Sequence, residues 1–401
     1  MPAPSATAIG PAPALTTGWL SASDCSLDDF IAVVGRQTRL EDYPYADDVA
    51  SNVLLYGERM RTAALGPDRR AVQAELMRAL TAGPGIVVFQ GAFPDLSVVD
   101  RATEAFLARI EVEKAAGSSS GDHFAKPGAN DRVWGALDKL AMSDPEVFAD
   151  YYANDVIALV SEAWLGPGYQ VTSQVNVVNP GGQAQTAHRD YHLGFMDASS
   201  SARFPAHAHR LSPVLTLQGA VAHCDMPVET GPTLYLPYSH QYEPGYLAFH
   251  LPEFTDYFLE HYTQLPLRRG DAAFFNPALF HGAGTNRSSD VRRMANLLQV
   301  SSPFGRAMEA VDRVAICRAV YPVLLARKAA GAADRYLDNV VAAGAEGYPF
   351  PTNLDRDQPI GGMAPQTQAA LVRQALAEGW GAPELDAALT EHAARTRPGH
   401  G

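Results

Sequence analysis

Between Gly168 and about Ser301, short runs of apolar and β-branched residues alternate with turn signals, and few helical patterns separate them. Pro-Gly, Gly-Pro and Asn-Pro pairs lie between these runs, as is typical of tight connections. The runs are "YQVTSQVNVVN", "TAHRDYHLGF", "SPVLTLQGAVAHC", "PTLYLP", "QLPLRRGDAAFF", "ALFHGAG" and "VRRMANLLQVS". Such a series of short strands favours an antiparallel sandwich or a double-sheet jelly roll.

Helical patterns lie on both sides of this β-rich region. Before it, apolar residues recur at three- and four-residue steps over 48–65 and 68–83, and after about residue 313 the same spacing returns. The Ala- and Pro-rich start of the chain is expected to form a flexible arm. We therefore expect a mainly β core with flanking helices, divided into an arm (1–17), an N-terminal helical extension (18–83), a β domain (84–305) and a C-terminal helical extension (306–401).

Composition excludes several classes of function. The formal net charge of −13 disfavours binding to nucleic acid, which needs clustered Lys and Arg. Three cysteines without metal-type spacing predict no disulfide framework, and no signal sequence or long apolar run is apparent. We expect a soluble, cytoplasmic protein that acts on a small molecule, without a membrane or nucleic-acid partner. The oligomeric state is left open.

The stretch "QTAHRDYHLGF" at 185–195 places His188, Asp190 and His192 at alternate positions. In a strand, residues i and i+2 point to the same face, so His188 and Asp190 can chelate one metal ion. A third ligand on a neighbouring strand would complete the two-histidine, one-carboxylate triad of non-haem Fe(II) oxygenases. The candidate is His281, which ends an apolar run before a glycine-rich turn.

Arg292 follows His281 by eleven residues, on the next predicted strand. An arginine near an iron site can pair bidentately with a carboxylate such as the far end of 2-oxoglutarate. Arg293 competes with it, because adjacent strand residues face opposite sides and the pleat is not fixed by sequence.

The segments "GIVVFQGAFPD", "AHRDYHLGF", "AVAHCDMPVETGPTLYLPYSH" and "RRGDAAFFNPALFHGAGTNRSSDVRR" occur in this order along the chain. Together they resemble the phytanoyl-CoA dioxygenase family of Fe(II)/2-oxoglutarate oxygenases, over roughly residues 83–305. The resemblance implies a double-stranded β-helix, a cupin-like variant of the jelly roll. It also implies that His188, Asp190 and His281 hold Fe(II), that Arg292 binds 2-oxoglutarate, and that O2 is the second cosubstrate.

Two positions concern the cosubstrate further. The family often has a hydroxyl residue two positions after the distal histidine, where this chain has Ala283. The missing hydrogen bond would have to come from elsewhere, and the candidates are Thr285, Thr233 and Gln174. Some family members also use a lysine upstream of the β core, for which Lys139 is the match.

Candidate substrate contacts lie on the β core and on two polar loops. His192 is either a contact near the metal or a hydrogen-bonded core histidine, and Asn176 is a further candidate on the β core. Residues 196–213 form either a surface loop or a substrate lid, offering His207, His209 and Arg210. A similar loop at 118–134 offers His123, Lys126 and Arg132.

The resemblance implies hydroxylation of an unactivated C–H bond of a small organic substrate, with 2-oxoglutarate converted to succinate and CO2. Epoxidation, desaturation and cyclisation use the same ligands and remain alternatives. A halogenating branch of these oxygenases lacks the carboxylate ligand, whereas Asp190 is present here. The hypotheses from other classes are a non-catalytic binding protein and a zinc-dependent cupin-like protein.

Overall fold

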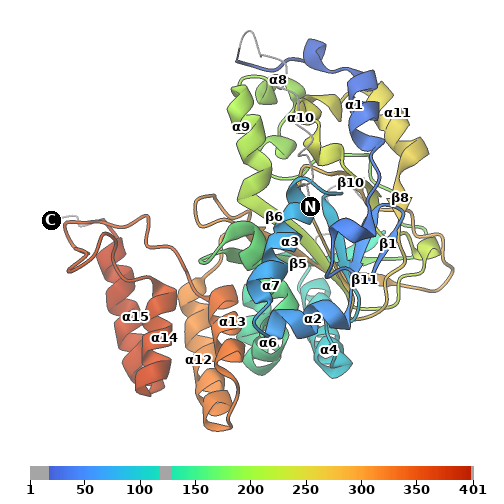
Figure 1. The fold of residues 1–401 in the computed structure, drawn as a ribbon. Helices are drawn as coiled ribbons and strands as arrows, with labels where there is room; N and C mark the ends of the chain where they lie inside the picture. Colours follow the sequence, from blue (N-terminus) through green and yellow to red (C-terminus); the bar gives the residue numbers. More distant parts are fainter. Residues whose placement is uncertain (1–17, 118–128, 399–401) are drawn as a thin grey trace, which may run out of the picture.

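The structure is a computed structural model that describes residues 18–117 and 129–398. The expected arm over 1–17 lies outside these residues. A large mixed sheet and a small antiparallel sheet form a double-stranded β-helix, as the sequence predicted, and helices surround it (Figure 1).

The large sheet has eight strands, and all neighbouring pairs except β2 and β3 are antiparallel. In spatial order they are β1 (Asp48–Ala50), β2 (Val53–Tyr56), β3 (Ile86–Phe89), β9 (Ala272–Phe275), β6 (Thr216–Ala222), β11 (Arg293–Ser301), β5 (Gln170–Val178) and β4 (Asn130–Val133). The small sheet has the order β10 (Phe280–Gly282), β7 (Leu234–Leu236) and β8 (Thr263–Gln264).

One group of helices packs against the outer face of the large sheet, and its members also pack against one another. It comprises α2 (Glu58–Leu65), α3 (Arg69–Thr81), α4 (Leu96–Ala115), α5 (Ala136–Ser143), α6 (Pro145–Tyr152) and α7 (Asp155–Leu165). The C-terminal helices continue this layer and extend to one side of the molecule (Figure 1). They are α12 (Arg313–Ala329), α13 (Asp334–Gly344), α14 (Gln368–Glu378) and α15 (Ala382–Thr396).

A second group of helices lies at the opposite end and forms a cap (Figure 1). It consists of α1 (Leu27–Val34), α8 (Ala198–Ser201), α9 (Ala206–Leu211), α10 (Gly245–Ala248) and α11 (Pro252–His261). No helix in the described part of the chain combines the length and the apolar composition needed to cross a bilayer.

The helix predicted over 48–65 is wrong in its first half. Residues 48–56 form the hairpin β1–β2, and only Glu58–Leu65 is helical. The hairpin turns at Ser51 and Asn52, which both have positive φ, and a turn of this kind matches the twist of paired strands. Because β2 then pairs with β3, the N-terminal region contributes two strands to the large sheet.

The strand predicted over 186–195 is also wrong. Only His188 makes a bridge, to His281, and His192–Phe195 is a 3-10 helix. Tyr191 and His192 have φ values of 56° and 52°, which no strand residue adopts. The alternation that placed His192 on the same face as Asp190 therefore does not hold.

Behind the large sheet, His223 follows β6 and is buried. Its Nδ1 lies 2.8 Å from the Thr103 hydroxyl and its Nε2 lies 3.0 Å from the Tyr151 hydroxyl. Burial lowers the pKa of His223 to about 3. The ring is therefore neutral in the folded protein throughout the range in which an unfolded histidine takes up a proton.

We expect His223→Gln to weaken the acid sensitivity of the fold. Below pH about 6.5, His223 binds a proton in the unfolded wild-type chain but not in the folded chain. The free energy of unfolding therefore decreases as pH falls towards the folded pKa of about 3. The slope is about 1.4 kcal/mol per pH unit for each such group. Urea unfolding at pH 6.5 and 5.5 should show a smaller loss for the variant, while replacement of the exposed His207 leaves the loss unchanged. Identical slopes in wild type and His223→Gln would contradict this expectation.

Candidate metal centre and adjoining cavity

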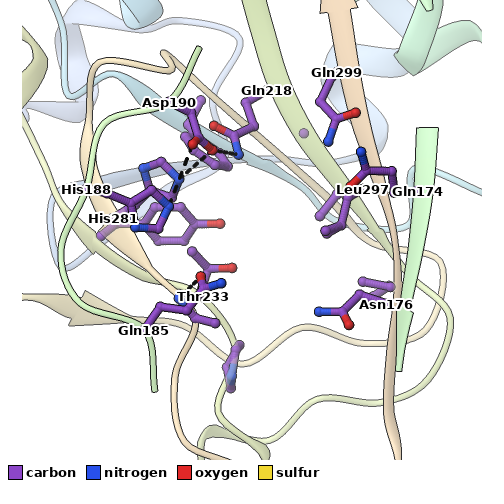
Figure 2. A pocket seen from close by; sticks show the side chains of 18 of the residues that line it. Gln174, Asn176, Gln185, His188, Asp190, Gln218, Thr233, His281, Leu297 and Gln299 are labelled. Atoms are coloured by element: carbon purple, nitrogen blue, oxygen red, sulfur yellow. Dashed lines mark hydrogen bonds and ion pairs between the residues drawn. The ribbon is translucent and has the colours of Figure 1, made fainter. Parts of the chain in front are cut away.

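His188, Asp190 and His281 come together between the two sheets. His281 lies on β10, and His188 is held beside it by paired backbone hydrogen bonds of 3.0 and 3.2 Å. One potential ligand atom from each of the three side chains lies within 4.8 Å of the others. The Nε2 atoms of His188 and His281 lie 3.8 and 3.3 Å from the two oxygens of Asp190. Figure 2 shows the three side chains converging at one end of a cavity.

The hydrogen bonds of the two histidines favour one tautomer. Nδ1 of His188 lies 2.9 Å from the carbonyl oxygen of Thr186, and Nδ1 of His281 lies 2.8 Å from that of Leu279. A carbonyl only accepts, so in each neutral ring Nδ1 carries the proton and the lone pair lies on Nε2. Two lone pairs and a carboxylate then face one another without a proton between them. A divalent cation fits this arrangement.

Asp190 is held in its ionised form. Burial alone would raise its pKa, but in the metal-free protein the positive charge of protonated His188 and His281, a hydrogen bond from His281 and a 2.6 Å hydrogen bond from the Gln218 amide lower the pKa to about 2. The carboxylate is therefore charged at neutral pH, as a metal ligand must be. Gln218 also fixes the orientation of the carboxylate, because its Nε2 donates to Oδ2.

The triad opens onto a cavity of about 390 Å³ whose floor is the inner face of the large sheet. Uncharged amides and apolar side chains form most of the wall across from the metal ligands (Figure 2). The lining includes Trp134, Gln174, Asn176, Gln185, Tyr191, Phe195, Gln218, Ala220, Ala222, Thr233, Tyr235, Ala283, Ala295, Leu297, Gln299 and Met308.

Of the two neighbouring arginines, Arg293 begins β11 and lines the cavity, whereas Arg292 precedes the strand and does not, so the position of Arg292 does not support its expected role. Arg293 lines the cavity together with Ala295, Leu297 and Gln299, which share its face because strand side chains alternate. Arg292 instead lies outside the cavity. Its guanidinium pairs with Asp131 at 2.9 Å, and its side chain is 48% exposed.

Arg293 is a buried cation, and the one hydrogen bond of its guanidinium within the described residues is a long one to a backbone carbonyl. Its guanidinium lies 3.5 Å from the oxygen of Gly284, and no carboxylate of the described residues lies within ion-pair distance. Burial lowers its pKa to about 10, which leaves it charged at neutral pH. A buried charge is costly unless it is paired, so this cavity is suited to an anionic ligand.

Of the other cosubstrate candidates, Thr233 and Gln174 line the cavity and two do not. Gln174 accepts a hydrogen bond from Arg132 and donates one to Glu309, on the wall away from the triad. The hydroxyl of Thr285 accepts from the backbone of Ala184 outside the cavity. Lys139 pairs with Glu113 at 2.7 Å among the outer helices, so its expected role is not supported by its position.

Of the substrate candidates, Asn176 and Arg132 line the cavity, with the Arg132 guanidinium lying over the Trp134 ring. His192 does not: its Nε2 lies 3.2 Å from the Thr216 hydroxyl, as in the core-histidine alternative.

The segment 196–213 contains two short helices, α8 and α9, joined by a turn. His207 is exposed on α9, Arg210 pairs with Glu243 at 2.6 Å, and His209 is buried against the carbonyl of Ser201. None of these three side chains lines the cavity. His123 and Lys126 lie outside the described residues.

Sequence reasoning missed Gln218 and Tyr191. In "TLQGAVA" the small residues Ala220 and Ala222 share a strand face with Gln218, a pattern that leaves space for a ligand beside one polar side chain. For Tyr191, which follows Asp190 directly, no local signal was available because its position depends on a positive φ.

Solved structures of non-haem 2-oxoglutarate-dependent enzymes are similar to this chain. Among solved structures, the non-haem α-ketoglutarate-dependent epimerase SnoN from nogalamycin biosynthesis is 20% identical, with a TM-score of 0.40 over 58% of this chain and 84% of SnoN. HygX from Streptomyces hygroscopicus, solved with nickel and 2-oxoglutarate, is 15% identical, with a TM-score of 0.39 over 57% of this chain and 87% of HygX.

A curated relative, the dioxygenase trt7 of Aspergillus terreus, is 29% identical over 161 residues. This match covers 38% of the present chain and spans about half (51%) of the relative's length. The model of the phytanoyl-CoA dioxygenase family matches residues 69–294, which is more than half of the chain and includes all three triad residues. The chain therefore belongs to the phytanoyl-CoA dioxygenase family.

Proposed function

We propose that this chain is an Fe(II)- and 2-oxoglutarate-dependent dioxygenase that hydroxylates an unactivated C–H bond of a small organic substrate. The observation that carries the proposal is a triad of acceptor atoms and a buried, unpaired arginine in one cavity. His188, Asp190 and His281 would hold Fe(II) on one face and leave the opposite positions open for a chelating ligand. Bound iron, with 2-oxoglutarate and O2, would supply the oxidising chemistry and release succinate and CO2.

Arg293 would bind the distal carboxylate of 2-oxoglutarate. It lies near Tyr235 of the small sheet, whose partner in the β7–β10 ladder is His281, so the guanidinium faces the strand pair that carries this metal ligand. Thr233 directly precedes β7 and lines the cavity. It is our candidate for the hydrogen bond that Ala283 does not provide. The amide and aromatic side chains on the wall away from the triad would bind the substrate.

Hydroxylation is favoured over halogenation because Asp190 occupies the position that a halide ligand would need. Epoxidation, desaturation and cyclisation require the same residues and are outcomes that product analysis would identify. A zinc-dependent protein of this fold would have no use for a buried guanidinium in the same cavity, and this favours the oxygenase.

Anaerobic titration tests the proposal. Addition of Fe(II) and then 2-oxoglutarate is expected to produce the visible charge-transfer absorption of a chelated 2-oxo acid. With O2 and a panel of acids, amino acids and acyl thioesters, succinate should form faster in the presence of the true substrate. A protein that binds Fe(II) but develops no such absorption with 2-oxoglutarate would refute the proposal.

A further inference from the structure

Arg189 lies between His188 and Asp190 in sequence but points away from them into the cap. It is 1% exposed, and its guanidinium donates hydrogen bonds to the carbonyl oxygens of Ser239 and Tyr242 at 2.6 and 2.9 Å. The rings of Tyr246 and Phe280 lie 5.0 and 5.3 Å from the guanidinium carbon.

Gly245, at the start of α10, closes the space around the guanidinium. A Cβ atom there would lie 1.9 Å from the Arg189 guanidinium carbon, so no other residue fits while Arg189 keeps its place. The guanidinium is therefore held between the metal-binding turn and α10.

This placement is a poor way to stabilise a fold. No carboxylate of the described residues lies within ion-pair distance of Arg189, and its Nε has no hydrogen-bond partner. The carbonyls that it contacts have other donors, the backbone N–H of Tyr242 for Ser239 and that of Gly245 for Tyr242. Because an unpaired buried charge is costly, an apolar side chain of similar size would serve the core better.

The metal-binding turn, in contrast, needs an anchor. At the two ligands, the backbone of the turn makes two connections to the β10 region. His188 bridges to His281 of β10, and the Asp190 N–H donates a 2.8 Å hydrogen bond to the carbonyl oxygen of Pro277, which precedes β10. The following residue, Tyr191, has φ 56° and ψ 154°, a conformation that is nearly restricted to glycine. Such strain persists only where neighbouring contacts hold the segment in place.

We propose that Arg189 is a positioning residue for the metal centre: its contacts to the cap hold the strained turn so that His188 and Asp190 face the cation. The inference rests on the proposed function only in that these two residues bind a divalent metal ion. It makes the cap, through α10, part of the support of the metal site.

Arg189→Met tests the inference, with Arg313→Met as a matched control. Arg313 is also a buried arginine that donates to two backbone carbonyls, those of Val171 and Ala343, but it lies on α12 and does not line the cavity. Arg189→Met is expected to weaken Fe(II) binding about 10- to 100-fold, the range found when residues that orient metal ligands are lost. It should also change the visible spectrum of bound Co(II). Arg313→Met should bind both metals as the wild type does.

The sign of the effect separates positioning from simple electrostatics. Removal of a nearby positive charge would by itself strengthen the binding of a cation. Weaker binding in Arg189→Met therefore supports positioning, whereas equal or stronger binding overturns it. An equal loss in both variants would also overturn it, because a general weakening of the fold would then explain the result.

Folding of each variant is checked by circular dichroism and thermal unfolding. Where Arg189→Met does not fold, Arg189→Lys decides, because it keeps the charge but loses the planar fork. Weaker Fe(II) binding by this variant supports the inference and wild-type binding overturns it. If the wild-type protein fails to bind Fe(II), both the metal site and this inference are overturned. If wild type and variant bind Fe(II) equally well, only the positioning role of Arg189 is overturned.

Discussion

Asp190→Ala is expected to abolish the formation of succinate and to reduce Fe(II) affinity by more than the roughly 100-fold typical of losing an outer-sphere partner. Among the described residues that line the cavity, Asp190 is the only carboxylate, and its pKa of about 2 keeps it charged. Without it, two imidazoles would have to hold the cation without a compensating negative charge. Calorimetric or spectroscopic titration with Fe(II) under anaerobic conditions measures the effect.

Asp131→Ala is the matched control for this change. Asp131 also pairs with nitrogen groups, those of Lys114 and Arg292, but it lies outside the cavity. It should retain the Fe(II) affinity and turnover of the wild type. If Asp190→Ala folds normally and still turns over at the wild-type rate, its role as a ligand is refuted.

Arg293→Met is expected to weaken 2-oxoglutarate binding by more than 100-fold, while Arg292→Met leaves it unchanged. Loss of one partner of a buried charge pair costs about 3 kcal/mol or more, and about 1.4 kcal/mol corresponds to a factor of ten in affinity. Arg293 is buried in the cavity, whereas Arg292 lies outside it in an exposed pair with Asp131. Fe(II) affinity should be similar in both variants, because neither arginine is a ligand.

The adjacent pair is a sharp test, since the two residues have the same side chain and only Arg293 lines the cavity. The measurement is the 2-oxoglutarate dependence of the charge-transfer absorption in the Fe(II)-loaded protein. A large loss in Arg292→Met with none in Arg293→Met would show that the cosubstrate binds elsewhere than in this cavity.

The fold class and the pairing of His188 with Asp190 were predictable because both depend on short-range patterns, whereas His281, 91 residues from Asp190, came from the order of the motifs along the chain. Alternating apolar runs with Pro and Gly turns predicted the β core, and a single-residue spacing between His188 and Asp190 was enough to suggest a chelating pair. Two errors of secondary structure came from positive φ values. The segment 48–56 has helical spacing of its apolar residues but turns at Ser51 and Asn52, and the 186–195 run leaves strand geometry at Tyr191.

The choice between Arg292 and Arg293 depended on the register of β11, which pairs Arg293 with Val178 of β5. A shift of one residue exchanges every side chain between the two faces of a sheet, and no local pattern fixes it where both faces are buried. Lys139 and Thr285 were proposed from their positions in the sequence, which do not indicate where a side chain points. Their contacts to Glu113 and Ala184 direct both side chains elsewhere.

The sequence by itself determined the kind of fold and the metal-ligand chemistry. Only the tertiary structure decided which arginine enters the cavity, which amides form its wall, and how a buried Arg189 connects the metal-binding turn to the cap. The physical reason is that ligand chemistry is a property of residue types at short spacing. The direction of a side chain depends on strand register, backbone conformation and packing between segments that lie far apart in the chain.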